Sequence, residues 1–179
     1  MISENLNEAL NQIVGKFFAL NRLFDRAMSV ISVKHKALNS AKILHPILAH
    51  NFPLIADSVT ELQQKRNMLS RYPATPEGNE TYENPLQFYE VALEEFHNTE
   101  DVIEDALDLA MLQKDHVVKS FLNGLLNTWA NYIETMENIV DVCKMYGDDP
   151  RGQQMFDDEI EHCITVKQIV PEVIELDGD

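Results

Sequence analysis

The chain of 179 residues has a formal net charge of −16, so its surface repels the phosphate backbones of nucleic acids and anionic lipids. Its two cysteines cannot form a disulfide framework and indicate a reducing compartment. No run of about 18 apolar residues and no signal-peptide pattern is present, which predicts a complete cytoplasmic protein without a membrane span. With 45% apolar residues but only 6 Gly and 7 Pro, residues 1–179 should form one all-α domain.

The first two predicted helices are long. Apolar residues recur at three- and four-residue steps over residues 3–32, which predicts an amphipathic helix capped by Ser3. The same spacing continues over residues 38–72, but Pro46 and Pro53 fall inside this second helix. Because a proline lacks the backbone donor and crowds the preceding turn, we expect the helix to kink or break there.

Residues 71–85 form a segment without apolar periodicity. A loop of this length in a compact helical protein usually has a role. We expect it to carry the chain along the full length of a helical bundle, between two parallel helices. A disordered linker between two domains is the alternative, and it is less favoured because neither half would easily bury its own two-helix face.

Two further helices and a short tail complete the pattern. The third helix is predicted from residue 84 or 85 to residue 112, with Pro85 suited to its first turn. The fourth covers residues 114–146, and a short fifth covers 152–163, with one more turn expected over 171–176. Two helices, a long crossover, two helices and a short tail (about 147–179) predict a four-helix bundle.

Several motifs occur in a characteristic order along the chain: Leu6-Asn7-Glu8, the 71–85 crossover, Asn84-Pro85-Leu86, Ala92-Leu93-Glu94, the 107–115 turn, Ser120-Phe121-Leu122, and Gly147-Asp148-Asp149-Pro150 followed by Met155-Phe156-Asp157-Asp158-Glu159-Ile160. In order and spacing they resemble the ferritin family, in particular the bacterial non-haem ferritins. The resemblance implies a four-helix subunit that binds two irons through carboxylates and a histidine. It also implies that many subunits close into a hollow shell.

Aligning these motifs places the family's iron ligands at Ile13 in the first helix, near Ala49 and Phe52 in the second, at Phe96 in the third, and at Trp129 and Tyr132 in the fourth. No Asp or Glu occurs over residues 33–56 or 116–133. A di-iron centre needs hard oxygen ligands from all four helices. We therefore expect a degenerate site whose volume is filled by bulky side chains. The sequence predicts no catalytic, cofactor-binding or metal-binding residue, with iron bound only if the family role is retained.

Two pairs with Glu-x-x-His spacing lie elsewhere in the chain. If Phe96 faces the core, Glu94 lies about 200° round the helix, so Glu94 and His97 are expected on a solvated face. Glu159 and His162 belong to the predicted tail helix, where a surface or subunit-interface role is favoured. A metal site built from these four residues is the alternative.

Other polar features also have a simple interpretation. His45 and His50 are five residues apart and about 140° out of phase on an α-helix, so we expect them not to be joint ligands. An acidic run in the third helix would gather cations if it lined a cavity, but an exposed helix face is the ordinary explanation. This run comprises Glu94, Glu95, Glu100, Asp101, Glu104 and Asp105.

Three hypotheses of function follow. The first is a non-catalytic ferritin-like subunit for iron storage, assembling with itself or with a catalytic ferritin. The second is a metalloenzyme with a relocated site, and the third is a metal-free helical interaction protein. Phosphate-binding loops, nucleophile elbows and catalytic triads are absent from the sequence, so no other enzyme class is indicated.

Overall fold

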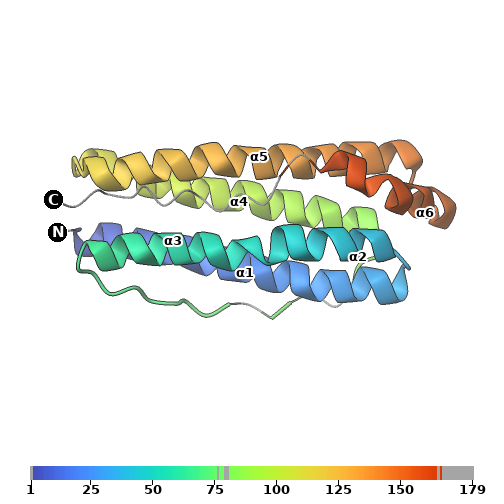
Figure 1. Ribbon diagram of the computed structural model, residues 1–179, viewed down its shortest axis with the longest axis horizontal. Helices are drawn as coiled ribbons and strands as arrows, with labels where there is room; N and C mark the ends of the chain where they lie inside the picture. Colours follow the sequence, from blue (N-terminus) through green and yellow to red (C-terminus); the bar gives the residue numbers. More distant parts are fainter. Residues whose placement is uncertain (1, 76, 79–80, 165, 167–179) are drawn as a thin grey trace.

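The computed structural model describes residues 2–75, 77–78, 81–164 and 166, and this part of the chain contains helices and no strand. The helices are α1 (Glu4–Lys34), α2 (Leu38–Leu44), the π-helical turn η1 (His45–Ala49), α3 (Asn51–Lys65), α4 (Pro85–Leu112), α5 (His116–Tyr146), α6 (Pro150–Glu159) and the 3₁₀ turn η2 (Ile160–Cys163). Figure 1 shows α1 beside α2 and α3, and α4 beside α5, with α6 at one end. The predicted all-α four-helix bundle with a short C-terminal helix is confirmed.

Two of the long helices begin at the residues that the sequence indicated. The Ser3 hydroxyl accepts a hydrogen bond from the Leu6 N–H at 3.2 Å. At the start of α4, the Asn84 side chain accepts one from the Gln87 N–H at 2.9 Å, and Pro85 occupies the first turn. Each cap satisfies an N–H that has no partner within the helix.

The second predicted helix ends earlier than expected. Helix α3 stops at Lys65, so the prediction that it continues to residue 72 is wrong. Asn67 has a φ of 57°, a left-handed conformation that terminates helices. Leu69, which fitted the apolar spacing, is 87% exposed and contributes nothing to the core.

The two prolines interrupt this segment as predicted, and the interruption takes the form of the π-helical turn η1. Because Pro53 has no N–H, the carbonyl of Ala49 loses its partner within the helix. The Asn21 amide of α1 donates to this carbonyl at 3.0 Å. A side chain from the neighbouring helix therefore supplies the hydrogen bond that the carbonyl lost.

The crossover between α3 and α4 runs along the bundle from one end to the other (Figure 1). It is held on α1, where the Arg71 N–H donates to the Asn11 side chain at 2.8 Å. One turn later, a Cβ at Gly15 would lie 3.0 Å from the Pro73 ring, so the glycine permits the close approach. This course agrees with the expected role of the crossover.

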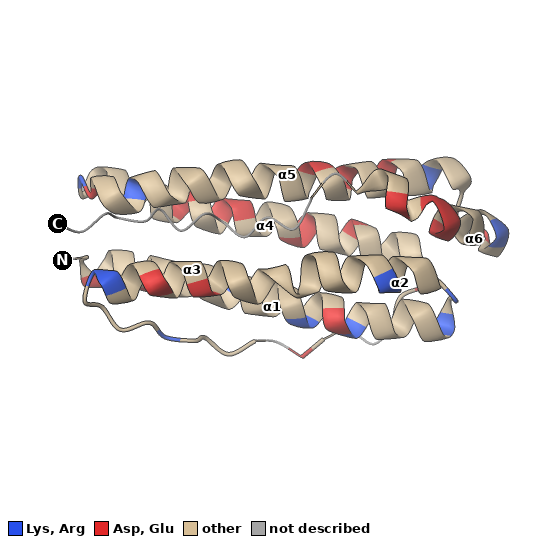
Figure 2. Cartoon of the chain, in the orientation of Figure 1, with Lys and Arg blue, Asp and Glu red and all other residues tan. Residues whose placement is uncertain are grey.

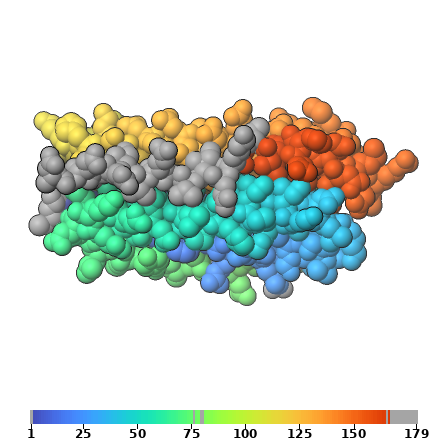
Figure 3. Space-filling view, viewed as in Figure 1, coloured from blue at the N-terminus to red at the C-terminus, as the bar shows by residue number. Residues whose placement is uncertain are grey.

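The tail helix α6 begins at Pro150, two residues before the predicted start. The Asp149 carboxylate accepts from the Gly152 N–H at 3.2 Å. A Cβ on Gly152 would lie 2.0 Å from the Tyr146 carbonyl oxygen, so only glycine allows the chain to fold back at this point. Figure 3 shows α6 packed against the α2 end of the bundle. The turn predicted over 171–176 lies outside the described residues.

Candidate functional site

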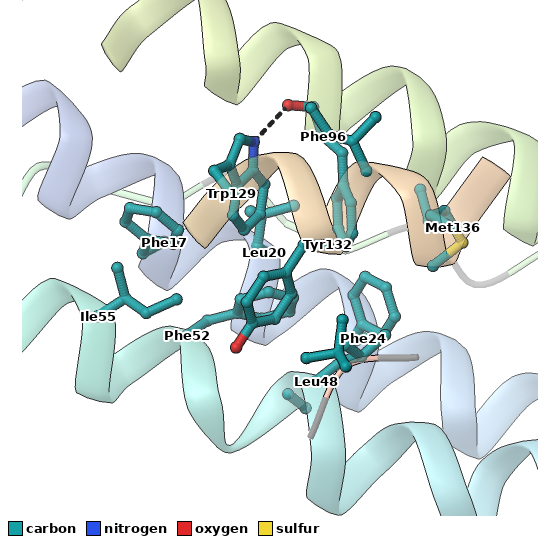
Figure 4. Close-up of a cluster of buried hydrophobic side chains, with 14 of the residues drawn as sticks. Phe17, Leu20, Phe24, Leu48, Phe52, Ile55, Phe96, Trp129, Tyr132 and Met136 are labelled. Atoms are coloured by element: carbon teal, nitrogen blue, oxygen red, sulfur yellow. Dashed lines mark hydrogen bonds between the residues drawn. The ribbon is translucent and has the colours of Figure 1, made fainter. Parts of the chain in front are cut away.

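Bulky apolar side chains fill the centre of the bundle (Figure 4). They are Phe17, Leu20 and Phe24 from α1, Leu48 from η1, Phe52 and Ile55 from α3, Phe96 from α4, and Trp129, Tyr132 and Met136 from α5. None of these residues is more than 2% exposed. The centre is therefore closed to solvent.

Trp129 connects three helices. Its Nε1–H donates to the main-chain carbonyl of Phe96 at 2.9 Å, so the buried indole leaves no donor unsatisfied. Its ring centroid lies 4.8 Å from that of Phe96, and the ring of Phe17 meets it edge-on at 5.2 Å. The indole thus fixes the spacing of α1, α4 and α5 at this level.

Tyr132 stacks on Trp129, with ring centroids 5.3 Å apart and planes inclined by 21°. Its hydroxyl accepts a hydrogen bond from the Asn51 amide at 3.3 Å, and burial raises the pKa of the hydroxyl. The same amide group donates to the Ile47 carbonyl at 2.7 Å. Among the described residues, the buried Asn51 Oδ1 has no hydrogen-bond partner. Asn51 and Tyr132 thus place polar groups beside this centre.

The aromatic network continues across the bundle through Phe52. Its ring centroid is 5.3 Å from that of Phe24 and 5.9 Å from that of Phe96. Such aromatic pairs contribute about 0.5 to 1.5 kcal/mol each beyond the burial of their area. The rings therefore stabilise the contacts between α1, α3 and α4.

No family model matches the chain, and no curated protein matches it. Solved structures do match. The open-pore ferritin from the hyperthermophilic archaeon Archaeoglobus fulgidus is 22% identical with a TM-score of 0.80, covering 89% of this chain and 98% of that one. An engineered closed form of the same ferritin and a humanized archaeal ferritin are each 20% identical, also with TM-scores of 0.80, covering 89% of this chain and 96% of theirs. This chain has the ferritin fold.

Within the ferritin fold, the positions at which the resemblance implies iron ligands all lie in the interior. Each is 0% exposed: Ile13, Ala49, Phe52, Phe96, Trp129 and Tyr132. The α1 ring that packs on Trp129 belongs to Phe17, one turn after Ile13. The apolar spacing placed Phe17 on the inner face of α1, but nothing in the sequence distinguished it from its neighbours there.

The groups at the centre of this ferritin fold do not fit two iron ions. Adjacent cations in a dry core require several carboxylates. The described centre offers the Asn51 amide and the Tyr132 hydroxyl, and neither is a negatively charged ligand at neutral pH. In the described ranges, no three His, Cys, Asp or Glu side chains are placed to hold a metal ion.

Glu94 and His97 are exposed, as the register with the buried Phe96 predicted. The nearest acidic partner recorded for His97 is Glu100, whose Oε2 lies 3.6 Å from the His97 Nδ1. The structure therefore does not bring Glu94 and His97 together as a pair of ligands. Their interpretation as a solvated face is confirmed.

Glu159 and His162 do approach each other at the end of the tail helix. The His162 Nε2 lies 3.6 Å from the Glu159 Oε2. The side chain of His162 is 80% exposed and that of Glu159 is 52% exposed, so a pairing here is screened by water. The position on the surface agrees with the prediction.

The expectation that His45 and His50 point to different sides of the helix is wrong. Their ring centroids lie only 4.5 Å apart in an edge-on contact. The intervening turn is π-helical, and the His50 N–H donates to the His45 carbonyl at 3.3 Å, five residues back. In such a turn, residues five apart come close to the same face. The phase of an ordinary α-helix does not apply.

Helix α4 has an acidic outer face (Figure 2), and it contains no Lys or Arg. Glu94, Asp101, Glu104 and Asp105 are exposed. Glu95 is partly buried, and its Oε2 lies 3.5 Å from the Lys16 Nζ of α1. This arrangement agrees with the predicted exposed face.

Proposed function

We propose that the chain is a non-catalytic ferritin-like subunit, which contributes to an iron-storing shell without a ferroxidase centre of its own. The observation that carries this proposal is the stack of Trp129 and Tyr132 at the centre of a ferritin fold. These two residues occupy positions where the resemblance implies iron ligands.

The filled centre argues against iron oxidation in the bundle. Residues 33–56 and 116–133 contain no Asp or Glu, so a change of register within these two stretches would not supply a carboxylate. Bringing iron there would require displacing Trp129, whose indole is hydrogen-bonded and fully buried. Losing such a packed side chain costs several kcal/mol, roughly 3 to 5.

A shell role is supported by the fold that the chain shares with archaeal ferritins, which are described as open-pore and closed forms. We infer that this chain assembles with copies of itself or with a catalytic ferritin, and that iron is cargo rather than a resident cofactor. Because each subunit carries a formal charge of −16, like subunits repel one another when salt is low. Assembly should therefore strengthen as salt is added.

Aerobic addition of ferrous iron to the purified protein tests the absence of a ferroxidase centre. We expect oxidation at the rate of the buffer alone, whereas a fast and saturable phase would overturn the proposal.

Native mass measurement and particle imaging, at low and at physiological salt, test whether the chain forms a shell. A monomer or small dimer under both conditions would instead favour the metal-free interaction protein. Mixing with a catalytic ferritin, followed by the same measurement, detects co-assembly.

A further inference from the structure

The π-helical turn η1 creates a pair of neighbouring imidazoles that an α-helix would separate. The rings of His45 and His50 lie edge-on with centroids 4.5 Å apart. The i to i+5 hydrogen bond between their backbones, at 3.3 Å, fixes this register. The pair is therefore a consequence of the interrupted helix and not of sequence spacing alone.

A carboxylate from the next helix completes the group. The Asp25 Oδ1 of α1 lies 3.0 Å from the His45 Nε2. Asn21, one turn earlier on the same face of α1, donates to the Ala49 carbonyl of η1 and holds the two elements together. The backbones that carry His45, His50 and Asp25 are thus fixed relative to each other.

The side chains of this group remain accessible. The side chain of His45 is 41% exposed and that of Asp25 is 46% exposed, and His50 is also exposed. These side chains can therefore give up their contacts with one another and bind an ion from solvent without opening the core. The strongly negative chain raises the local concentration of cations.

Basic side chains also lie on or beside the elements that carry this group. Arg22 borders a pocket that Glu77 and Glu95 also line. The stem of Arg26 packs against Gly78 of the crossover, and Lys42 borders a pocket on the side of Glu161.

We propose that His45, His50 and Asp25 bind a divalent transition-metal ion on the outside of the bundle. Two imidazole nitrogens and a carboxylate oxygen form a ligand set typical of zinc sites, with water in the remaining positions. Without an ion, no three such side chains among the described residues are arranged to hold a metal. The incoming ion therefore replaces the contact between His45 and Asp25, and the exposed imidazole rotates toward it.

Equilibrium dialysis of the chelator-washed full chain against Zn²⁺, at about pH 7.5, tests this site. We expect His45→Gln and His50→Gln each to remove one bound zinc or to weaken its binding by at least about tenfold. Asp25→Asn should weaken it by a smaller factor. His97→Gln and His162→Gln are the matched controls, because each removes an exposed histidine that lies near a glutamate.

Zinc binding by His45→Gln and His50→Gln that equals binding by the parent would overturn the proposal. So would an equal loss in the two control variants, since that would indicate general binding by surface histidines. Circular dichroism confirms that each variant is folded. Visible absorption of Co²⁺, used as a second probe, should show nitrogen coordination in the parent and lose it in His50→Gln. An unchanged Co²⁺ spectrum in that variant would also overturn the site.

Discussion

The carboxylate of Asp157 in α6 accepts a hydrogen bond from the main-chain N–H of Ser40 in α2 at 2.8 Å. Its second oxygen accepts from the Asn39 N–H at 3.0 Å. The N-cap residue of α2 is Ala37, which has no side chain that can cap a helix, so the cap comes from a residue more than a hundred positions away. The Tyr89 hydroxyl donates to the Ser40 Oγ at 2.8 Å, which extends the contact to α4. The tail helix is thus part of the fold.

Asp157→Ala should lower the free energy of unfolding by about 3 kcal/mol, because it leaves the buried Ser40 N–H and the partly buried Asn39 N–H without acceptors. Asp157→Asn should cost less, since an amide oxygen still accepts one hydrogen bond. Urea denaturation followed by circular dichroism measures both. The control is Asp158→Ala, which removes an exposed carboxylate that contacts only the Asn39 side chain among the described residues. A similar loss in the two alanine variants would contradict the capping role.

The sequence predicted the fold through the apolar faces of its helices, which are long and strongly periodic. It could not predict the end of α3, because exposed Leu69 continues the same spacing that the buried residues follow. The proline positions indicated a break but not its form, because the π-helical turn is accompanied by a contact from another helix, the hydrogen bond that Asn21 of α1 donates to Ala49. For the same reason, the proximity of His45 and His50 could not be foreseen.

The candidate site was predictable in its composition and not in its contacts. The absence of carboxylates over residues 33–56 is visible in the sequence alone. The hydrogen bond from Trp129 to the Phe96 carbonyl and the packing of Phe17 on the indole depend on how three helices are placed relative to each other. Such contacts join residues far apart in the chain, and no local pattern encodes them.

Trp129→Phe should lower the free energy of unfolding by about 1 to 3 kcal/mol, since it removes a buried hydrogen bond and part of the packed volume. Trp129→Ala should cost roughly 3 to 5 kcal/mol because it leaves a larger cavity. Denaturant unfolding followed by circular dichroism measures each change. Met145→Ala, at a side chain that is 82% exposed, should change stability by less than about 0.5 kcal/mol. A change of that small size in Trp129→Ala would contradict the tight packing of Trp129 at the centre of the bundle.

Replacing the bulky pair by the family's ligand types should not create iron oxidation. The variant Trp129→Gln with Tyr132→Glu introduces one carboxylate into a centre where α2, η1 and the start of α3, up to residue 56, still supply none. The buried charge lacks a partner, so we expect a loss of roughly 3 to 5 kcal/mol in stability. Ferrous oxidation should stay at the buffer rate. A fast phase in this folded variant would mean that other ligands are within reach.

Cys143 provides a prediction about alkaline pH. Burial is the main cause that raises the pKa of its thiol from 9.0 to about 11. Between these values the unfolded chain loses this proton while the folded chain keeps it, so the folded state binds more protons and the free energy of unfolding falls as pH rises. The contribution is complete below about pH 9 and is lost on the way to pH 11. Cys143→Ala should flatten this part of the profile, and urea midpoints measured at intervals of pH compare the two proteins.

The comparison between parent and Cys143→Ala isolates the thiol from the other groups that titrate in the same range. Tyr132 and Cys163 also have pKa values raised by burial, but both groups are present in the two proteins. The small cavity left by alanine lowers stability by a similar amount at every pH, so a difference in slope between the two proteins comes from the thiol. Equal slopes for the two proteins between pH 9 and pH 11 would show that Cys143 ionises as readily when folded as when unfolded, and would contradict its burial against Gln153.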